Sequence, residues 1–126
     1  MHDVLVDTSV WVDHLNKGEP LLQDLLSSAQ VATHPFIIGE LACGQLSNRT
    51  EILRLLSELP LVTIASNEEV MHLIEKHKLG GKGLGWIDAH LLASALLDHM
   101  PLWTRDRKLS AVAKTLRITS AKQKER

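Results

Sequence analysis

The chain has 126 residues, of which 44% are hydrophobic and 23% are charged, and its formal net charge is −1. This is the size and composition of one globular domain, and it excludes a disordered chain. The single cysteine excludes a disulfide framework, and the longest apolar run, residues 91–97, is far shorter than the roughly 20 residues of a membrane-spanning helix. Because no secretory signal opens the chain, we expect a cytoplasmic protein without a membrane anchor.

Short apolar runs alternate with longer helical patterns along the chain. The predicted strands are residues 4–6, 31–33, 61–64 and 101–103, with a short edge strand at 117–119. Helical patterns occupy residues 8–15, 21–29, 35–46, 52–59, 66–78, 86–99 and 106–116. The helix-start signals are Thr8 or Ser9, Pro35, the capping box of Ser66 with Glu69, and Asp106.

Alternation of this kind predicts a parallel sheet covered by helices on both faces. The expected fold is therefore α/β, a small doubly wound parallel sheet of four to five strands. We expect residues 1–119 to form the single domain and residues 120–126 to form a polar, loose tail.

Four carboxylates fall at one edge of this predicted sheet, where the carboxyl ends of the strands meet the starts of the following helices. Asp7 and Asp106 follow predicted strands, Glu40 lies early in the helix after the second strand, and Asp88 lies in a first helical turn. Two carboxylates about 4 Å apart repel by roughly 4 kcal/mol at an effective dielectric near 20. Four carboxylates placed together therefore need either raised pKa values or a bound cation. Because all of their ligand atoms are oxygens, the cation they suit is Mg²⁺ or Mn²⁺. The plainer alternative is that they are helix caps and solvated helix residues.

Several motifs carry a family resemblance over residues 1–119. They are Asp7-Thr8-Ser9-Val10-Trp11, Gly39-Glu40-Leu41-Ala42, the run from Trp86-Ile87-Asp88 to Ser94-Ala95, and the run from Trp103-Thr104-Arg105-Asp106 to Leu109. In this order they resemble the PIN-domain family, and within it the VapC-type toxin ribonucleases of bacterial toxin–antitoxin systems. The resemblance implies an endoribonuclease whose metal-holding acids are Asp7, Glu40, Asp88 and Asp106, with Thr104 as a further catalytic-site residue.

The same resemblance implies partners and a cofactor. It implies Mg²⁺, with Mn²⁺ as a substitute, hydrolysis of RNA by metal-activated water, a homodimer, and an antitoxin that blocks the site. An antitoxin arginine inserted among the carboxylates would relieve their repulsion. The leucine-rich helices between Leu21 and Leu59, with Trp11 nearby, offer an apolar groove for the same partner or complete the core of a monomer.

Basic residues border the expected acidic site. Residues 1–75 carry 11 acidic against 3 basic side chains, whereas residues 76–126 carry 4 acidic against 11 basic ones. The predicted RNA-binding residues are Arg105, Arg107 and Lys108, with Lys82 in the glycine-rich segment. The alternative for these residues is a solvated basic face.

Two rival functions remain beside the ribonuclease. A receiver-like signalling module needs an aspartate after its third strand, and residues 61–67 contain none. A non-catalytic interaction domain with the same fold stays open. The seven histidines show no metal-ligand spacing and are expected at the surface, Cys43 is expected as a small packed side chain, and the glycine-rich segment 80–85 is expected as a connector.

Overall fold

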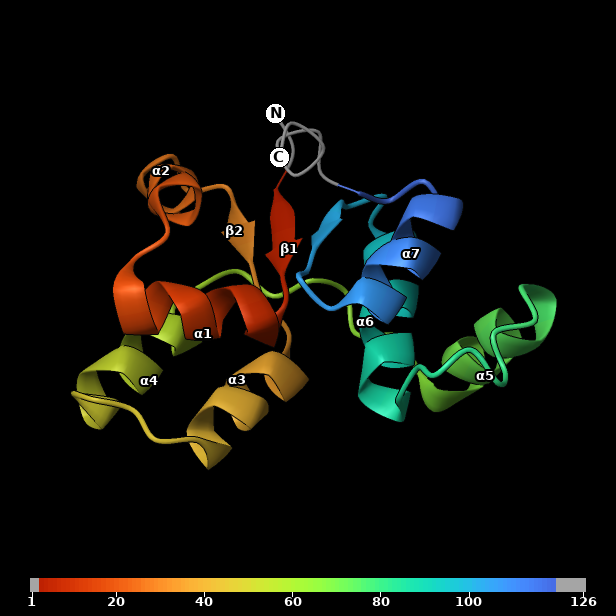
Figure 1. The fold of residues 1–126 in the computed structure, drawn as a ribbon, viewed down its shortest axis with the longest axis horizontal. Coiled ribbons are helices and arrows are strands. Elements are labelled where there is room, and N and C mark those ends of the chain that lie inside the picture. The colour runs from red at the N-terminus through yellow and green to blue at the C-terminus, as the bar shows by residue number, and fades with distance from the viewer. Residues whose placement is uncertain (1–2, 120–126) are drawn as a thin grey trace.

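A computed structural model describes residues 3–119 and places a parallel sheet at the centre of the molecule (Figure 1). Its strands are β1 (Val4–Val6), β2 (Val31–Ala32) and β3 (Leu102–Trp103), in the order β2-β1-β3. Leu5 of β1 pairs with Ala32 on one side and with Leu102 on the other, both in parallel. The predicted α/β class and the doubly wound parallel sheet are confirmed.

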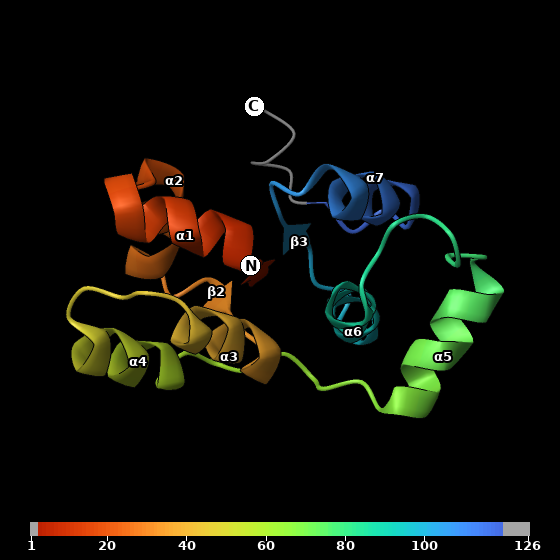
Figure 2. The ribbon, with the colours of Figure 1, turned by 60° about the horizontal axis from the view of Figure 1, so that its bottom comes forward.

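Helices cover both faces of this sheet. They are α1 (Thr8–Lys17), α2 (Pro20–Ser27), α3 (Pro35–Cys43), α4 (Arg49–Ser57), α5 (Asn67–Lys76), α6 (Trp86–Leu97) and α7 (Arg107–Thr115). Figure 2 shows α1, α2 and α7 on one side of the strands and α3, α4 and α6 on the other. All three strands are buried throughout, as expected of a parallel sheet covered on both faces. No helix within residues 3–119 is long and apolar enough to cross a membrane.

The predicted number of four to five strands is wrong for the described residues. The segments at 61–64 and 117–119 make only single parallel bridges, Thr33 to Leu61 and Leu102 to Thr119. The first segment leaves the sheet because side chains of α6 and of its C-cap accept hydrogen bonds from the backbone here: the Thr63 N–H donates to Asp98, and the N–H of the following Ala65 donates to Ser94. The second segment begins at Arg117, whose φ of 62° is incompatible with an extended strand.

Most helix starts follow the predicted signals. Ser66 and Glu69 form the expected capping box, Pro35 is the first residue of α3, and the Asp106 carboxylate accepts the Leu109 N–H at 2.9 Å. The expectation that Thr8 or Ser9 caps the first helix is wrong, because α1 begins at Thr8 and both hydroxyls bond to carboxylates instead.

The glycine-rich segment 80–85 returns the chain to the carboxyl edge of the sheet. Gly81 and Gly83 have φ values near +80°, which favour glycine, and these turns let α6 begin beside α7. At Gly83 an added Cβ would lie 2.7 Å from Cδ of Lys108, so the segment passes directly under that side chain. This routing places Asp88, in the first turn of α6, at the same edge as Asp7. The predicted tail, residues 120–126, lies outside the described residues.

Candidate active site

Asp7 is the buried centre of the acidic site. It follows β1 directly and is only 6% exposed. Its side chain does not cap α1. Instead, Oδ2 accepts hydrogen bonds from the Ser9 hydroxyl at 2.8 Å and from the Thr104 hydroxyl at 2.7 Å. Because both bonds go to Oδ2, Oδ1 has no donor among the described residues, and the interpretation of Asp7 as a mere helix cap fails.

The two hydroxyls tie Asp7 to the segment after β3. Thr104 Oγ1 accepts the N–H of Asp106 at 3.0 Å, and Ser9 Oγ accepts the N–H of Arg105 at 3.0 Å. Each hydroxyl therefore donates to Asp7 and accepts from a backbone N–H of the next loop, which fixes its orientation. This network holds Asp7 and Asp106, 99 positions apart in the sequence, in one arrangement.

Asp88 completes a group of three mutually repelling acids. Burial raises its pKa, and the negative charges of Asp7 and Asp106 raise it further, while the hydrogen bond from Gly85 N–H to Asp88 Oδ2 acts in the opposite direction. Asp106 caps α7 through Oδ1 and is exposed. The structure thus brings Asp7, Asp88 and Asp106 within electrostatic reach of one another.

Glu40 approaches the same edge from α3. Its Oε1 accepts the hydroxyl of Thr8 at 2.6 Å, and Thr8 is the neighbour of Asp7 in the chain. Glu40 is exposed, so its carboxylate lies at the rim of the site while Asp7 lies at its base. Asp7, Asp88 and Asp106 therefore lie at the starts of α1, α6 and α7, which Figure 1 shows below the sheet, and Glu40 lies in the second turn of α3 and bonds to Thr8.

The donor set fits a hard divalent cation. Carboxylate oxygens are the ligands of Mg²⁺ and Mn²⁺, and a cation would relieve the repulsion from Asp7 and Asp106 that, in addition to burial, raises the pKa of Asp88. Across residues 3–119, no three carboxylate, histidine or cysteine side chains stand close enough to hold a metal ion as they are. Mg²⁺ usually keeps several waters and contacts only one or two carboxylates, so such a site does not need three protein ligands in direct contact.

Replacing Thr104 by Val is expected to destabilise the protein by about 1 to 3 kcal/mol, because it removes a buried donor to Asp7 and an acceptor of the Asp106 N–H. Urea unfolding measures the loss. The matched control is Thr115→Val, since Thr115 is exposed on α7 and its hydroxyl bonds only to the carbonyl of Ala111. Equal stability of the two variants would contradict a tightly held Asp7.

The predicted basic border divides into two parts. Arg105 forms ion pairs with Asp13, at 2.6 Å, and with the buried Glu19, and its guanidinium lies 5.7 Å from the ring centre of Trp103. It is thus engaged within the protein. Three other cations, Lys82, Arg107 and Lys108, are exposed and line one open hollow of about 440 Å³ between the glycine-rich segment and α7.

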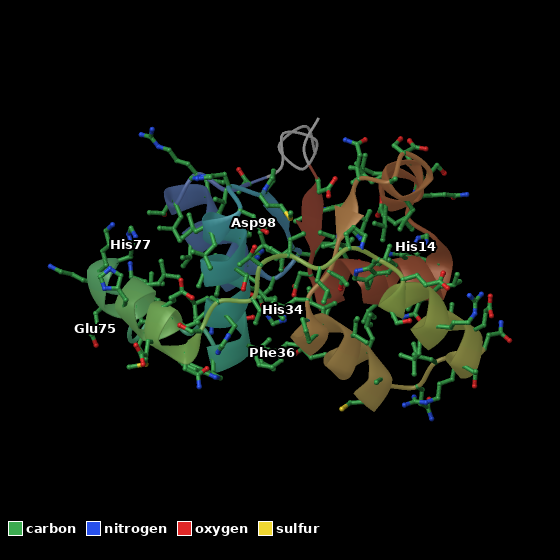
Figure 3. All side chains as sticks on the ribbon, turned by 180° about the vertical axis from the view of Figure 1, so that it is seen from behind. His14, His34, Phe36, Glu75, His77 and Asp98 are labelled. Atoms are coloured by element: carbon green, nitrogen blue, oxygen red, sulfur yellow. The ribbon has the colours of Figure 1, made fainter. Side chains whose placement is uncertain are left out.

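Sequence reasoning missed several residues. Ser9 was indistinguishable from a helix cap, because hydroxyls at the start of a helix give the same signal in both roles. His34 and His90 are buried, 1% and 3% exposed, contrary to the expectation of surface histidines, and Cys43 is exposed rather than packed. Figure 3 shows His34 and Phe36 between α3 and α6, seen from behind.

Comparison with known proteins identifies the family of this chain. The family model of the PIN domain matches residues 4–115. Ribonuclease VapC32 of Mycobacterium tuberculosis, from strain CDC 1551 / Oshkosh and from strain ATCC 25618 / H37Rv, is 42% identical over 109 residues, which make up 86% of this chain and 88% of the relative. The chain therefore belongs to the PIN-domain family, as a VapC-type member.

Proposed function

We propose that this chain is a Mg²⁺-dependent endoribonuclease and acts as the toxin of a toxin–antitoxin pair. The observation that carries the proposal is the buried Asp7, held by two hydroxyls and close enough to Asp88 to raise its pKa, in a chain 42% identical to a ribonuclease. The direct test is cleavage of total cellular RNA by the purified protein in Mg²⁺, in Mn²⁺ and in chelator. Cleavage that is equal in all three contradicts the metal dependence.

Asp7, Asp88, Asp106 and Glu40 are the residues that would hold the metal, directly or through water. A bound Mg²⁺ or Mn²⁺ lowers the pKa of water and stabilises the charge that develops on a phosphodiester during in-line displacement. Thr104 and Ser9 keep Oδ1 of Asp7 free of competing donors by occupying Oδ2. The Gly85 N–H does the same for Asp88, because it fixes Oδ2 and leaves Oδ1 for a ligand.

Lys82, Arg107 and Lys108 supply the contact with the RNA backbone. They line one hollow next to the glycine-rich segment that precedes Asp88 and the helix that begins after Asp106. Phosphate contacts of this kind position RNA without reading its sequence. Arg105, in the segment between β3 and α7, is held instead by Asp13 and Glu19, so its role in our proposal is positioning of that segment rather than RNA binding.

Arg107→Ala and Lys108→Ala are each expected to weaken the binding of single-stranded RNA and to reduce the slope of log affinity against log salt concentration by about 0.7. Filter binding in chelator at several salt concentrations measures both quantities. Lys114→Ala is the matched control, because Lys114 is an exposed cation of the same helix and does not line the hollow. If all three variants keep the wild-type slope, the border is only a solvated basic face.

A cognate antitoxin would bind two neighbouring surfaces. One is the acidic site, where an inserted arginine would make bidentate bonds to two carboxylates. The other is an apolar groove of about 390 Å³ between α1, α2 and α4, in which Trp11, Leu26 and Leu55 are lining residues. This groove lies where the leucine-rich helices were expected to provide one, and its lining suits the apolar face of a helical segment.

Asp7→Asn and Leu55→Glu are both expected to weaken binding of a cognate antitoxin, and excess Mg²⁺ is expected to compete with it in the wild type. The first variant removes charge from the acidic site, and the second places a charge in the apolar groove. Calorimetry at several Mg²⁺ concentrations measures the affinities. An antitoxin that binds wild type and Asp7→Asn equally at every Mg²⁺ concentration does not act through the acidic site.

The proposal includes a homodimer and a cytoplasmic location. Large apolar side chains are exposed on α3, α5 and α6, among them Phe36, Met71 and Leu97, and a second copy could cover part of them. Cellular RNA and an antitoxin are both partners that a cytoplasmic protein meets.

A further inference from the structure

A small cavity lies beside the acidic site and is not explained by the catalytic residues. It has a volume of about 190 Å³ and lies between α5 and the start of α6, under the glycine-rich segment. Buried Leu79 and Ala89 contribute apolar surface, Gly81 and Gly85 contribute backbone, and Trp86 contributes an aromatic ring. Pockets for whole drug-sized ligands start at about 300 Å³, so this cavity has room for a single ring system.

Trp86 is the exposed tryptophan of this chain. It is 45% exposed, whereas Trp11 and Trp103 are buried in the core. Its ring is held by the buried His90, with ring centres 4.7 Å apart and planes at 82°. The edge-on contact with His90 orients the indole, while nearly half of the indole surface stays in solvent. A planar group can therefore stack on the exposed part of this ring without moving it.

The cavity and the acidic site share Gly85. The N–H of Gly85, a lining residue, donates to Asp88 Oδ2 at 3.0 Å. On the same segment, Gly83 touches the Lys108 side chain, and Lys82 lines the basic hollow with Lys108. An RNA strand whose phosphates contact Lys82 and Lys108, with one phosphate at the carboxylates, therefore has a neighbouring base within reach of Trp86.

We propose that this cavity binds one unstacked nucleobase of the substrate RNA, next to the phosphodiester that is cleaved. The base stacks on Trp86, and its polar edge meets the peptide groups of the glycine-rich segment, which no side chain shields at Gly80 and Gly81. Stacking on an aromatic ring accepts every base, and the peptide groups add a preference among bases at that position. The inference rests on the proposed ribonuclease activity and assigns that activity a site of base selection.

Two substitutions test the cavity: one removes the aromatic ring at Trp86, and the other adds a side chain at Gly80. Trp86→Leu removes the stacking ring and is expected to lower kcat/KM on RNA by between about fivefold and about a hundredfold, with a relaxed base preference at one position, while Trp86→Phe retains most of both. Gly80→Val adds a branched side chain at a lining residue of the cavity, and the backbone tolerates it because Gly80 has an ordinary φ and open space around an added Cβ. The matched control is Met71→Ala, because Met71 is an exposed apolar residue of α5 outside the cavity.

The measurements are mapping of cleavage sites on total cellular RNA and intrinsic fluorescence. Because Trp86 is the exposed tryptophan, its emission is expected to be quenched by at least one of poly(U), poly(A) and poly(C) in chelator, and this quenching is expected to disappear in Trp86→Phe. Thermal unfolding confirms that each variant is folded.

Three outcomes decide the inference. If Trp86→Leu and Gly80→Val cleave the same sites at the wild-type rate, the cavity does not bind a base, although the ribonuclease proposal stands. If Trp86 emission changes with protein concentration and light-scattering mass but not with RNA, a second copy covers the ring, and the inference is wrong. If the wild type cleaves no RNA, the proposed function fails by itself, and quenching by the homopolymers still reports on the cavity.

Discussion

Asp7→Asn is expected to lower RNA cleavage by about a hundredfold or more while leaving the protein at least as stable as the wild type. The loss follows because Lewis-acid stabilisation by a bound divalent cation is worth several kcal/mol, and Asp7 is the buried acid that would hold it. The stability follows because the substitution removes a negative charge that raises the pKa of Asp88, so the pKa of Asp88 is expected to fall toward its ordinary value.

Three measurements check this prediction together: initial rates of cleavage in Mg²⁺, thermal unfolding, and carboxyl titration of Asp88 by NMR. Asp24→Asn serves as the control, since Asp24 is an exposed acid on α2 and its loss removes the same charge at a distance from the site. Wild-type cleavage that survives both chelator and Asp7→Asn removes the metal mechanism. A variant that is inactive only because it is unfolded would show itself in the unfolding curve.

Local signals in the sequence predicted the elements that position the site. The run Val4–Val6 is fully buried and pairs on both sides, so an uninterrupted apolar strand was the correct expectation. The capping box of Ser66 with Glu69 and the cap of Asp106 depend only on neighbours three residues away, which is why the sequence reveals them. The strand at 61–64 was overpredicted, because the N–H groups of Thr63 and of the following Ala65 bond to side chains about 30 positions distant. The strand at 117–119 was overpredicted because its first residue, Arg117, has a positive φ.

In the candidate site, too, the features that depend on neighbouring residues were predictable, and the contacts between residues far apart in the sequence were not. The placement of four acids near one sheet edge follows from strand and helix order, which periodicity provides. The hydroxyl network does not, because Thr104 meets Asp7, and Ser9 meets the Arg105 N–H, only after β1 and β3 pair across almost the whole chain. The ion pairs of Arg105 with Asp13 and Glu19 could not be predicted from the sequence either. A basic residue next to an acid of the site gives the same sequence pattern whether its side chain faces RNA or pairs within the protein.

The buried histidines were missed because no sequence pattern separates a histidine that packs from one that faces solvent. His34 precedes the first proline of α3, and its ring caps that helix by accepting the Phe36 N–H at Nδ1, 2.9 Å away. Nδ1 is therefore unprotonated, and the remaining proton is on Nε2, which has no partner among the described residues. The ring of His90 packs nearby, with ring centres 6.4 Å apart, and within residues 3–119 neither histidine forms an ion pair with an acid.

Lowering the pH from 6.5 to 4 is expected to remove up to about 3 kcal/mol of folding stability through His34 alone. Burial and, to a smaller extent, the neighbouring His90 lower the pKa of His34 from 6.5 to about 4. Between these two values the unfolded chain binds a proton that the folded protein does not, so the contribution is complete above pH 6.5 and is lost as the pH falls. Burial also lowers the pKa of His90, which adds to the loss in the same direction.

His34→Asn isolates this effect, because an asparagine at the N-cap accepts the same backbone N–H but does not titrate. The variant is expected to be less stable at pH 7, where it loses the packing of the imidazole, and to lose less stability than the wild type as the pH falls from 6.5 to 4. Urea unfolding at half-unit pH steps measures both curves, and His72→Asn, at an exposed position of α5, gives the slope for a histidine outside the core. Parallel curves for His34→Asn and the wild type would mean that His34 is protonated in the folded protein, and that a charge on its ring is tolerated between α3 and α6.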